Sequence, residues 1–138
     1  MNRLVGPPQR IVDDFITKPA YSIDENATIK QGKAKMKELN TDFLVVTKNN
    51  KPEYILREVE TVFLKPNDTI SKIAHQGKLD SAVVIESGSL WASTIPRLSE
   101  NTLLIIVDTK TQPPQLRGAI STYEMNWKAQ RRQQYRNW

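Results

Sequence analysis

Two apolar runs, Phe43-Leu44-Val45-Val46 and Leu103-Leu104-Ile105-Ile106, organise the sequence. Each run is compact and rich in branched side chains, which is typical of a β-strand. The stretch that leads into each run has the same spacing, from residue 28 to 41 in one copy and from 89 to 102 in the other. This internal similarity predicts two structural repeats in one chain.

Outward from the first run, residues 28–39 are predicted to form a helix. Ile29, Met36 and Leu39 recur near helical spacing, and Thr28 offers a side-chain oxygen to cap the first turn. On the other side, the turn residues 48–52 are followed by the apolar residues 54–56, which predicts a β-hairpin. Residues 20–23 are a short strand candidate, so the first copy reads strand, helix, strand, strand.

The second copy allows two registers. In the preferred one, residues 82–85 open the unit, residues 89–100 form the helix, and residues 103–107 and 118–121 form the hairpin. Pro96 would break the interior of that helix. In the alternative, residues 61–64 are the opening strand, 70–76 the helix, and 82–85 the first strand of the hairpin. The sequence does not choose between them.

Composition restricts the class of protein. The chain has 138 residues, of which 38% are hydrophobic and 25% charged, as in an ordinary globular domain. It has no cysteine and a single histidine, His75, which argues against disulfides and zinc sites. No apolar run approaches the roughly 20 residues of a membrane span, and residues 1–9 lack the apolar stretch of a signal peptide. We therefore expect a cytoplasmic protein without membrane contact.

The segment Gly118-Ala119-Ile120-Ser121-Thr122-Tyr123-Glu124-Met125, after an apolar strand and a polar turn, resembles the end of a CBS (cystathionine-β-synthase) motif. Residues 11–60 resemble the family in their opening. The resemblance implies an α/β fold of two βαββ repeats, packed as a pseudo-twofold pair. We place an extended lead-in at residues 1–10, the first repeat at 11–60, the second at 61–125 and a basic helical tail at 126–138.

The resemblance also implies clefts between the repeats that often bind adenosine nucleotides such as AMP or ATP. Carried over to this sequence, the ligand-binding candidates are Gly118, Ser121 and Glu124, with glutamate in place of the family's aspartate. The first repeat departs from the pattern, because Tyr54, Arg57 and Glu60 stand at the matching positions. At most one nucleotide site is therefore expected, and no cofactor is required.

The tail holds most of the excess positive charge. Four cations and no acid lie in residues 126–138, and they account for all but one of the net charge of +5. A nucleic-acid arm, a partner-docking peptide and a terminal helix folded on the body all fit this composition. We favour a helix that docks on a partner, and nucleic acid is not favoured. The predicted partner-binding residues are Trp127, Arg131, Arg132, Tyr135, Arg136 and Trp138.

No enzyme is expected, since no nucleophile with a base and no glycine-rich phosphate loop is present in the sequence. The leading hypothesis is a regulatory, ligand-sensing module that binds an adenosine nucleotide between its repeats and acts on a partner protein, as a homodimer or within a larger assembly. The alternative is a structural adaptor with degenerate clefts that docks through its tail. A nucleic-acid-binding accessory protein is the third hypothesis.

Overall fold

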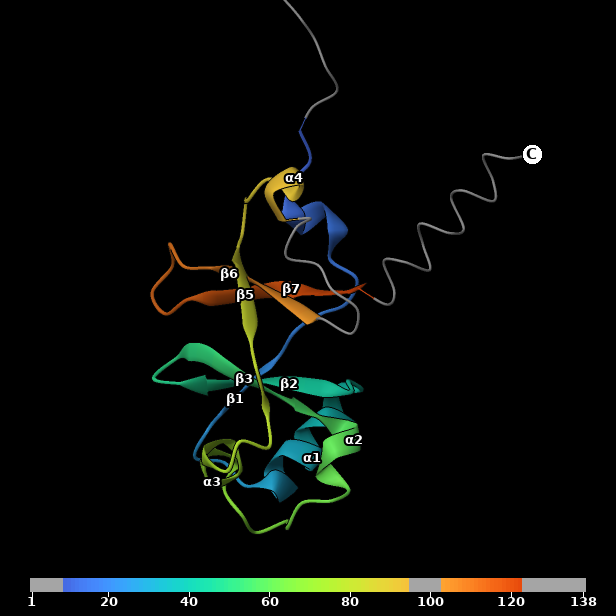
Figure 1. Ribbon diagram of the computed structural model, residues 1–138, viewed down its shortest axis with the longest axis vertical. Helices are drawn as coiled ribbons and strands as arrows, with labels where there is room; N and C mark the ends of the chain where they lie inside the picture. The colour runs from blue at the N-terminus through green and yellow to red at the C-terminus, as the bar shows by residue number, and fades with distance from the viewer. Residues whose placement is uncertain (1–8, 95–102, 123–138) are drawn as a thin grey trace, which may run out of the picture.

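The computed structural model describes residues 9–94 and 103–122, which form two sheets and several short helices (Figure 1). In chain order the elements are the 3-10 helix η1 (Val12–Phe15), β1 (Ser22–Asp24), α1 (Ile29–Leu39), β2 (Phe43–Lys48), β3 (Lys51–Arg57), α2 (Glu58–Thr61), α3 (Ile70–His75), β4 (Asp80–Ser81), β5 (Val83–Glu86), α4 (Trp91–Thr94), β6 (Leu103–Asp108) and β7 (Gln115–Ser121). No helix in these two ranges is long and apolar enough to cross a membrane.

The first repeat has the predicted order of strand, helix, strand, strand. Thr28 caps α1 as expected, because its side chain accepts a hydrogen bond from Gln31 N while the Gln31 side chain accepts one from Thr28 N. The hairpin of β2 and β3 turns through Asn49 and Asn50, which have φ values of 51° and 65°. Two successive left-handed residues are typical of the tight two-residue hairpin turn.

The second repeat adopts the preferred register. β5 pairs in parallel with β6, with Ile85 opposite Ile106, and β6 pairs antiparallel with β7. The alternative register is wrong in its strands, because residues 61–64 end α2 and turn, and parallel strands need a crossover rather than a hairpin between them. Its helix nevertheless exists, as α3. Of the helix predicted at 89–100, α4 covers Trp91–Thr94, and Pro96 lies outside the described residues.

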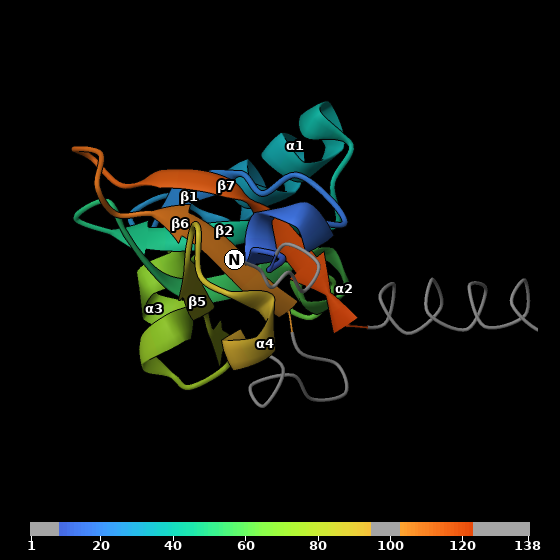
Figure 2. The same ribbon diagram turned by 90° about the horizontal axis from the view of Figure 1, so that it is seen from above.

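The sheets lie in the middle of a layered arrangement (Figures 1 and 2). Phe43, Val45, Ile105 and Val107 pack between the two sheets, so β2 and β6 face each other through alternate residues. The residues between them face outward, toward α1 and α3 on one side and toward η1 and Trp91 on the other. Both apolar runs are therefore buried on both faces, which accounts for their continuous hydrophobicity.

Each sheet also receives a segment from the other repeat. Lys18, just before β1, pairs with Ala119 of β7, and β4, just before β5, pairs with β3 through Tyr54 and Ser81. We call residues 17–21 and 78–82 the crossing segments, since each runs from one sheet to the other (Figure 1). The isolated bridges Ile11–Leu90 and Thr28–Thr69 also correspond by this symmetry. The two repeats are thus related by an approximate twofold arrangement.

Candidate functional site

A pocket of about 280 Å³ opens where the two hairpins meet at the same end of the sheets. Its wall joins residues of both repeats and of the first crossing segment. The lining residues are Lys18, Asp42, Phe43, Arg57, Val59, Leu103, Ser121 and Thr122. A second hollow of about 310 Å³ shares Lys18 and Asp42 with this pocket.

The pocket lies between equivalent positions of the repeats. In the first hairpin Phe43 pairs with Arg57, and in the second Leu103 pairs with Ser121. The start of one strand and the end of the next therefore meet at the pocket in both repeats. Because the sequences differ at these positions, one half of the pocket carries an aromatic ring and a guanidinium, and the other an aliphatic chain and a hydroxyl.

Lys18 brings a cation to the pocket from the first crossing segment. Its Nζ lies 5.2 Å from the centroid of the Phe43 ring and 3.4 Å from Oδ1 of Asp42. The backbone bridge between Lys18 and Ala119 fixes this part of the crossing segment on β7. A cation held over a ring face is stabilised by the electrostatics of the π system, so Lys18 has a defined position in the wall.

Arg57 contributes the second cation. Its Nη1 lies 2.6 Å from Oδ2 of Asp80 and 4.0 Å from Oε1 of Glu60. Asp80 belongs to β4, so this ion pair connects the second crossing segment to the end of β3. By the twofold arrangement, Arg57 corresponds in position to Ser121, and Asp80 of the second crossing segment corresponds to Lys18 of the first.

The predicted residue Ser121 lies in the pocket wall, and so does its neighbour Thr122, which was not predicted from the sequence. Thr17 Oγ1 accepts a hydrogen bond from the Ser121 backbone N–H at 2.9 Å and holds the end of β7. Thr122 is 5% exposed, and its Oγ1 has no hydrogen-bond partner among the described residues. A buried hydroxyl without a partner is uncommon, and Thr122 also contributes to the wall of the pocket.

Gly118 is not among the lining residues. A Cβ at this position would lie 2.6 Å from Cγ2 of Ile16 and 3.2 Å from the carbonyl oxygen of Lys18, and its φ of 153° is unfavourable for other residues. The absence of a side chain thus lets the first crossing segment approach β7. The expected contact of Gly118 with a ligand stays a prediction, while its packing role follows from these distances.

Other predicted residues fall outside the described chain, including Glu124 and the whole tail of residues 126–138. Sequence reasoning missed the pocket residues Lys18, Asp42 and Phe43 as well as Thr122. The only sequence signal for Lys18 was the break before Pro19 ahead of the opening strand. A lysine that is distant in sequence from Ser121 reaches the pocket only because the segment crosses between the sheets.

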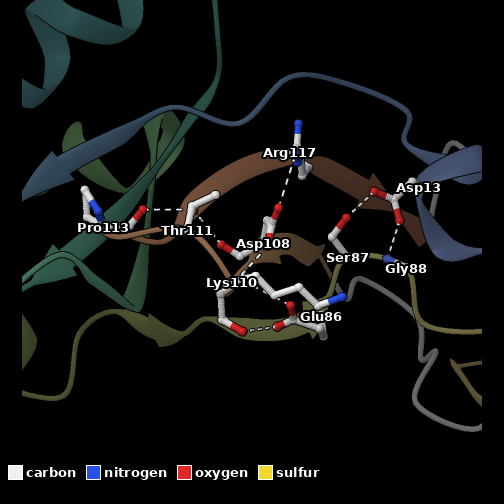
Figure 3. Close-up of polar contacts among 10 residues, drawn as sticks. Asp13, Glu86, Ser87, Gly88, Asp108, Lys110, Thr111, Pro113 and Arg117 are labelled. Carbon is white, nitrogen blue, oxygen red and sulfur yellow. Dashed lines mark hydrogen bonds and ion pairs between the residues drawn. The ribbon is translucent and has the colours of Figure 1, made fainter.

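A separate polar cluster, formed by Asp13, Glu86 and Asp108, does not form a metal site (Figure 3). Burial raises the pKa of Asp13, but hydrogen bonds from Ser87 Oγ and Gly88 N outweigh it and hold that pKa below its ordinary value. Hydrogen bonds from Lys110 N and the Arg117 guanidinium lower the pKa of Asp108. Protein donors already satisfy these carboxylates, and no group of three metal-binding side chains occurs in residues 9–94 and 103–122.

Comparison by sequence gives no match, since no protein-family model and no curated protein is similar to this chain. Comparison by structure, in contrast, finds similar proteins. The cytosolic domain of the Mg²⁺ channel MgtE in complex with ATP is similar with a TM-score of 0.61 and 12% identity, over 80% of this chain and 45% of that one. The chain thus spans less than half of that structure.

Two further solved structures match over most of both chains. A hemolysin-like protein containing a CBS domain, from Oenococcus oeni PSU, has a TM-score of 0.60 and 14% identity, over 85% of this chain and 88% of that one. The CBS domain protein PAE2072 from Pyrobaculum aerophilum, complexed with AMP, has a TM-score of 0.58 and 16% identity, over 83% and 88%. The chain has the α/β fold of a tandem CBS domain pair, as its sequence motifs predicted.

Proposed function

We propose that this CBS-type pair is a regulatory module that binds one adenosine nucleotide in the pocket between its repeats and acts on a partner protein. The observation that carries the proposal is the pocket between the repeats, whose wall contains the predicted residue Ser121 together with Lys18 and Arg57. Similar folds have been solved with ATP and with AMP, which supports the choice of ligand. The role is binding, without chemistry on the nucleotide.

The pocket offers groups that suit each part of a nucleotide. Phe43, Val59 and Leu103 provide apolar surface for the base. Ser121 provides a hydroxyl that can pair with a polar atom of the ligand, and Lys18 provides a positive charge. Glu124, which follows Thr122 by two residues, is kept as the predicted partner of the ribose hydroxyls.

One site per chain is expected. At the position in the first repeat that corresponds to Ser121, the long side chain of Arg57 is paired with Asp80 and Glu60. The Arg57 side chain thus replaces the small hydroxyl side chain that the second repeat offers.

Regulation by the nucleotide requires that it bind two conformations of the module with different affinity, because only differential binding shifts an equilibrium.

Calorimetric titration of the full chain with AMP and ATP tests the proposal, with Ser121→Leu as the variant and Ser22→Leu as its control. Ser121 lies in the pocket wall, whereas Ser22 is exposed at the start of β1. We expect one nucleotide per chain for the natural sequence and for Ser22→Leu, and a loss of binding for Ser121→Leu. Failure of both nucleotides to bind the natural chain at millimolar concentration would reject the nucleotide site.

An adaptor that docks on a partner, or on a second copy, is the second candidate. Val59, Val62 and Phe63 in and just after α2 have exposed fractions of 67%, 70% and 85%. Apolar side chains grouped on a surface favour protein contact. Light scattering of the natural chain and of Phe63→Glu tests the homodimer. The homodimer hypothesis predicts a dimer for the natural chain and a monomer for Phe63→Glu.

Deletion of residues 127–138 tests the tail, since loss of partner binding with an unchanged melting temperature indicates docking.

A further inference from the structure

Arg57 belongs to the first repeat, yet it lines the pocket that contains Ser121 and Thr122 of the second. Its side chain is 29% exposed and forms a short ion pair with Asp80, whose side chain is 73% exposed. The guanidinium is thus held at the pocket by a carboxylate that is itself mostly in solvent. Ion pairs with such an exposed member are weak, so Asp80 can be replaced as the partner of Arg57.

The charges around the pocket are already compensated. Lys18 is paired with Asp42, and Arg57 is paired with Asp80 and Glu60. Glu58 also lies nearby, in the second hollow that shares Lys18 and Asp42 with the pocket. Among the residues that the structure describes, the pocket therefore has no excess of positive charge to attract anions in general. An anionic ligand gains a strong contact only by taking a cation from one of these carboxylates.

We propose that Arg57 is the residue that recognises the phosphate of the bound nucleotide, and that Asp80 competes with the phosphate for it. The guanidinium is planar and forms two parallel hydrogen bonds with either a carboxylate or a phosphate, so one can replace the other. This inference rests on the proposed nucleotide site. It makes the pocket selective for phosphorylated adenosine over adenosine, and it makes Asp80 the residue that limits the affinity.

Competition of this kind also connects the ligand to the second crossing segment. Asp80 lies in β4, where it pairs with Ile55 of β3, and the chain continues from it into β5. When phosphate takes Arg57, the side-chain contact between β3 and β4 is lost while the backbone pairing remains. The segment between the two sheets then differs between the free and the bound chain, as a regulatory module requires.

Calorimetric titrations of the full chain with AMP and with adenosine test the inference, using Arg57→Gln and Asp80→Asn. Both variants remove the same ion pair, so each controls for the effect of its loss on folding. We expect Arg57→Gln to weaken AMP binding by about tenfold or more. Asp80→Asn should strengthen AMP binding, because the competitor is gone. Adenosine should bind all three chains with equal affinity.

The outcomes separate this inference from the proposed function. If neither AMP nor adenosine binds the natural chain, the nucleotide site itself is rejected. If AMP binds and its preference over adenosine is the same in Arg57→Gln, the phosphate role of Arg57 is rejected and the site stands. Weaker AMP binding by Asp80→Asn rejects the competition. If Arg57→Gln does not fold, Arg57→Lys replaces it, and an unchanged AMP affinity in that variant rejects recognition by the planar guanidinium.

Discussion

Ser87 Oγ donates a hydrogen bond of 2.6 Å to Oδ2 of Asp13, between residues 74 positions apart in the chain. The backbone N–H of Gly88 donates to the other oxygen of the same carboxylate at 2.7 Å. These contacts tie η1 to the turn between β5 and α4 (Figure 3). Next to them, Phe15 and Trp91 stack with their ring centroids 4.1 Å apart. The opening segment of the first repeat is thus fixed to the second repeat.

The Asp13 contact predicts a pH dependence of stability. Since the pKa of Asp13 is lowered in the fold, its ionised form stabilises the native state above the ordinary pKa of an aspartate. This stabilisation is lost as the pH falls through the lowered value. Asp13→Asn should reduce the free energy of unfolding by about 1 kcal/mol at neutral pH, and by less as the pH falls below about 4. Urea denaturation at several pH values measures both.

Glu53→Gln is the control for this series, because Glu53 is an exposed carboxylate on β3. Its difference from the natural chain should stay small at every pH. A difference for Asp13→Asn that does not narrow in acid would contradict the assigned role of the carboxylate.

Thr122→Val should raise the stability and leave nucleotide binding nearly unchanged. Removal of a buried hydroxyl that has no partner in the described part of the chain relieves its desolvation cost, so the free energy of unfolding should rise by about 1 kcal/mol. Nucleotide affinity should change little, since the buried oxygen is not exposed to the pocket and valine has a similar shape. Thermal unfolding with and without AMP measures the two effects together.

The matched control is Thr61→Val. Thr61 is also buried, but its Oγ1 donates a hydrogen bond of 2.7 Å to the carbonyl oxygen of Glu58. This substitution should lower the stability, because it leaves a carbonyl without its donor. Equal effects of the two valine substitutions would mean that the Thr122 hydroxyl is paired in solution.

Gly118→Ala should be strongly destabilising. Its new Cβ would approach Ile16 Cγ2 to 2.6 Å and the backbone of Lys18 to 3.2 Å, so the first crossing segment would have to move. We expect a loss of about 3 kcal/mol from strain and overpacking combined. Gly88→Ala isolates the backbone effect, because Gly88 has a φ of 86° and, apart from its chain neighbours, no described residue has an atom within 4 Å of the added Cβ. It should cost about 1 kcal/mol, and chemical denaturation that gives equal losses would contradict the close approach.

Asn50→Gly should stabilise the first hairpin. Asn50 has a φ of 65° at the second position of the two-residue turn, where glycine is less strained than asparagine. Relief of the left-handed strain should exceed the added entropy of the unfolded chain, so the expected net gain is about 0.5 kcal/mol in the free energy of unfolding. Asn50→Ala at the same position should lose stability instead. A thermal shift of the same sign for both variants would argue against the left-handed turn.

Much of the fold was predictable from local patterns. The runs at 43–46 and 103–106 became the central strands, and Thr28 capped its helix as expected. What was not predictable depends on distant contacts. β4 consists of two exposed residues with no periodicity to reveal it, and only its pairing with β3 makes it a strand. Similarly, the register of the second repeat was settled by the pairing of β5 with β6, because two helical segments of comparable strength precede the strands.

The candidate site was predictable in part. Ser121 was singled out by its place in a motif and lines the pocket. Lys18 and Asp42 were missed, since neither is unusual in its local sequence and both reach the pocket through the chain path. Gly118 was expected to admit a ligand, and the structure gives it a packing contact with Ile16. A motif thus identifies structurally constrained residues more reliably than it identifies the contact, with a ligand or with the protein, that constrains each of them.

The crossing segments make the two repeats depend on each other for their sheet edges. A chain divided between α2 and α3 would leave β3 without its partner β4 and β7 without the bridge from Lys18. Each half would then expose backbone groups that the intact chain pairs. We therefore expect the halves to be poorly soluble alone and to restore the fold by complementation when mixed. The intact domain should unfold in one cooperative transition, even though its sequence shows two units.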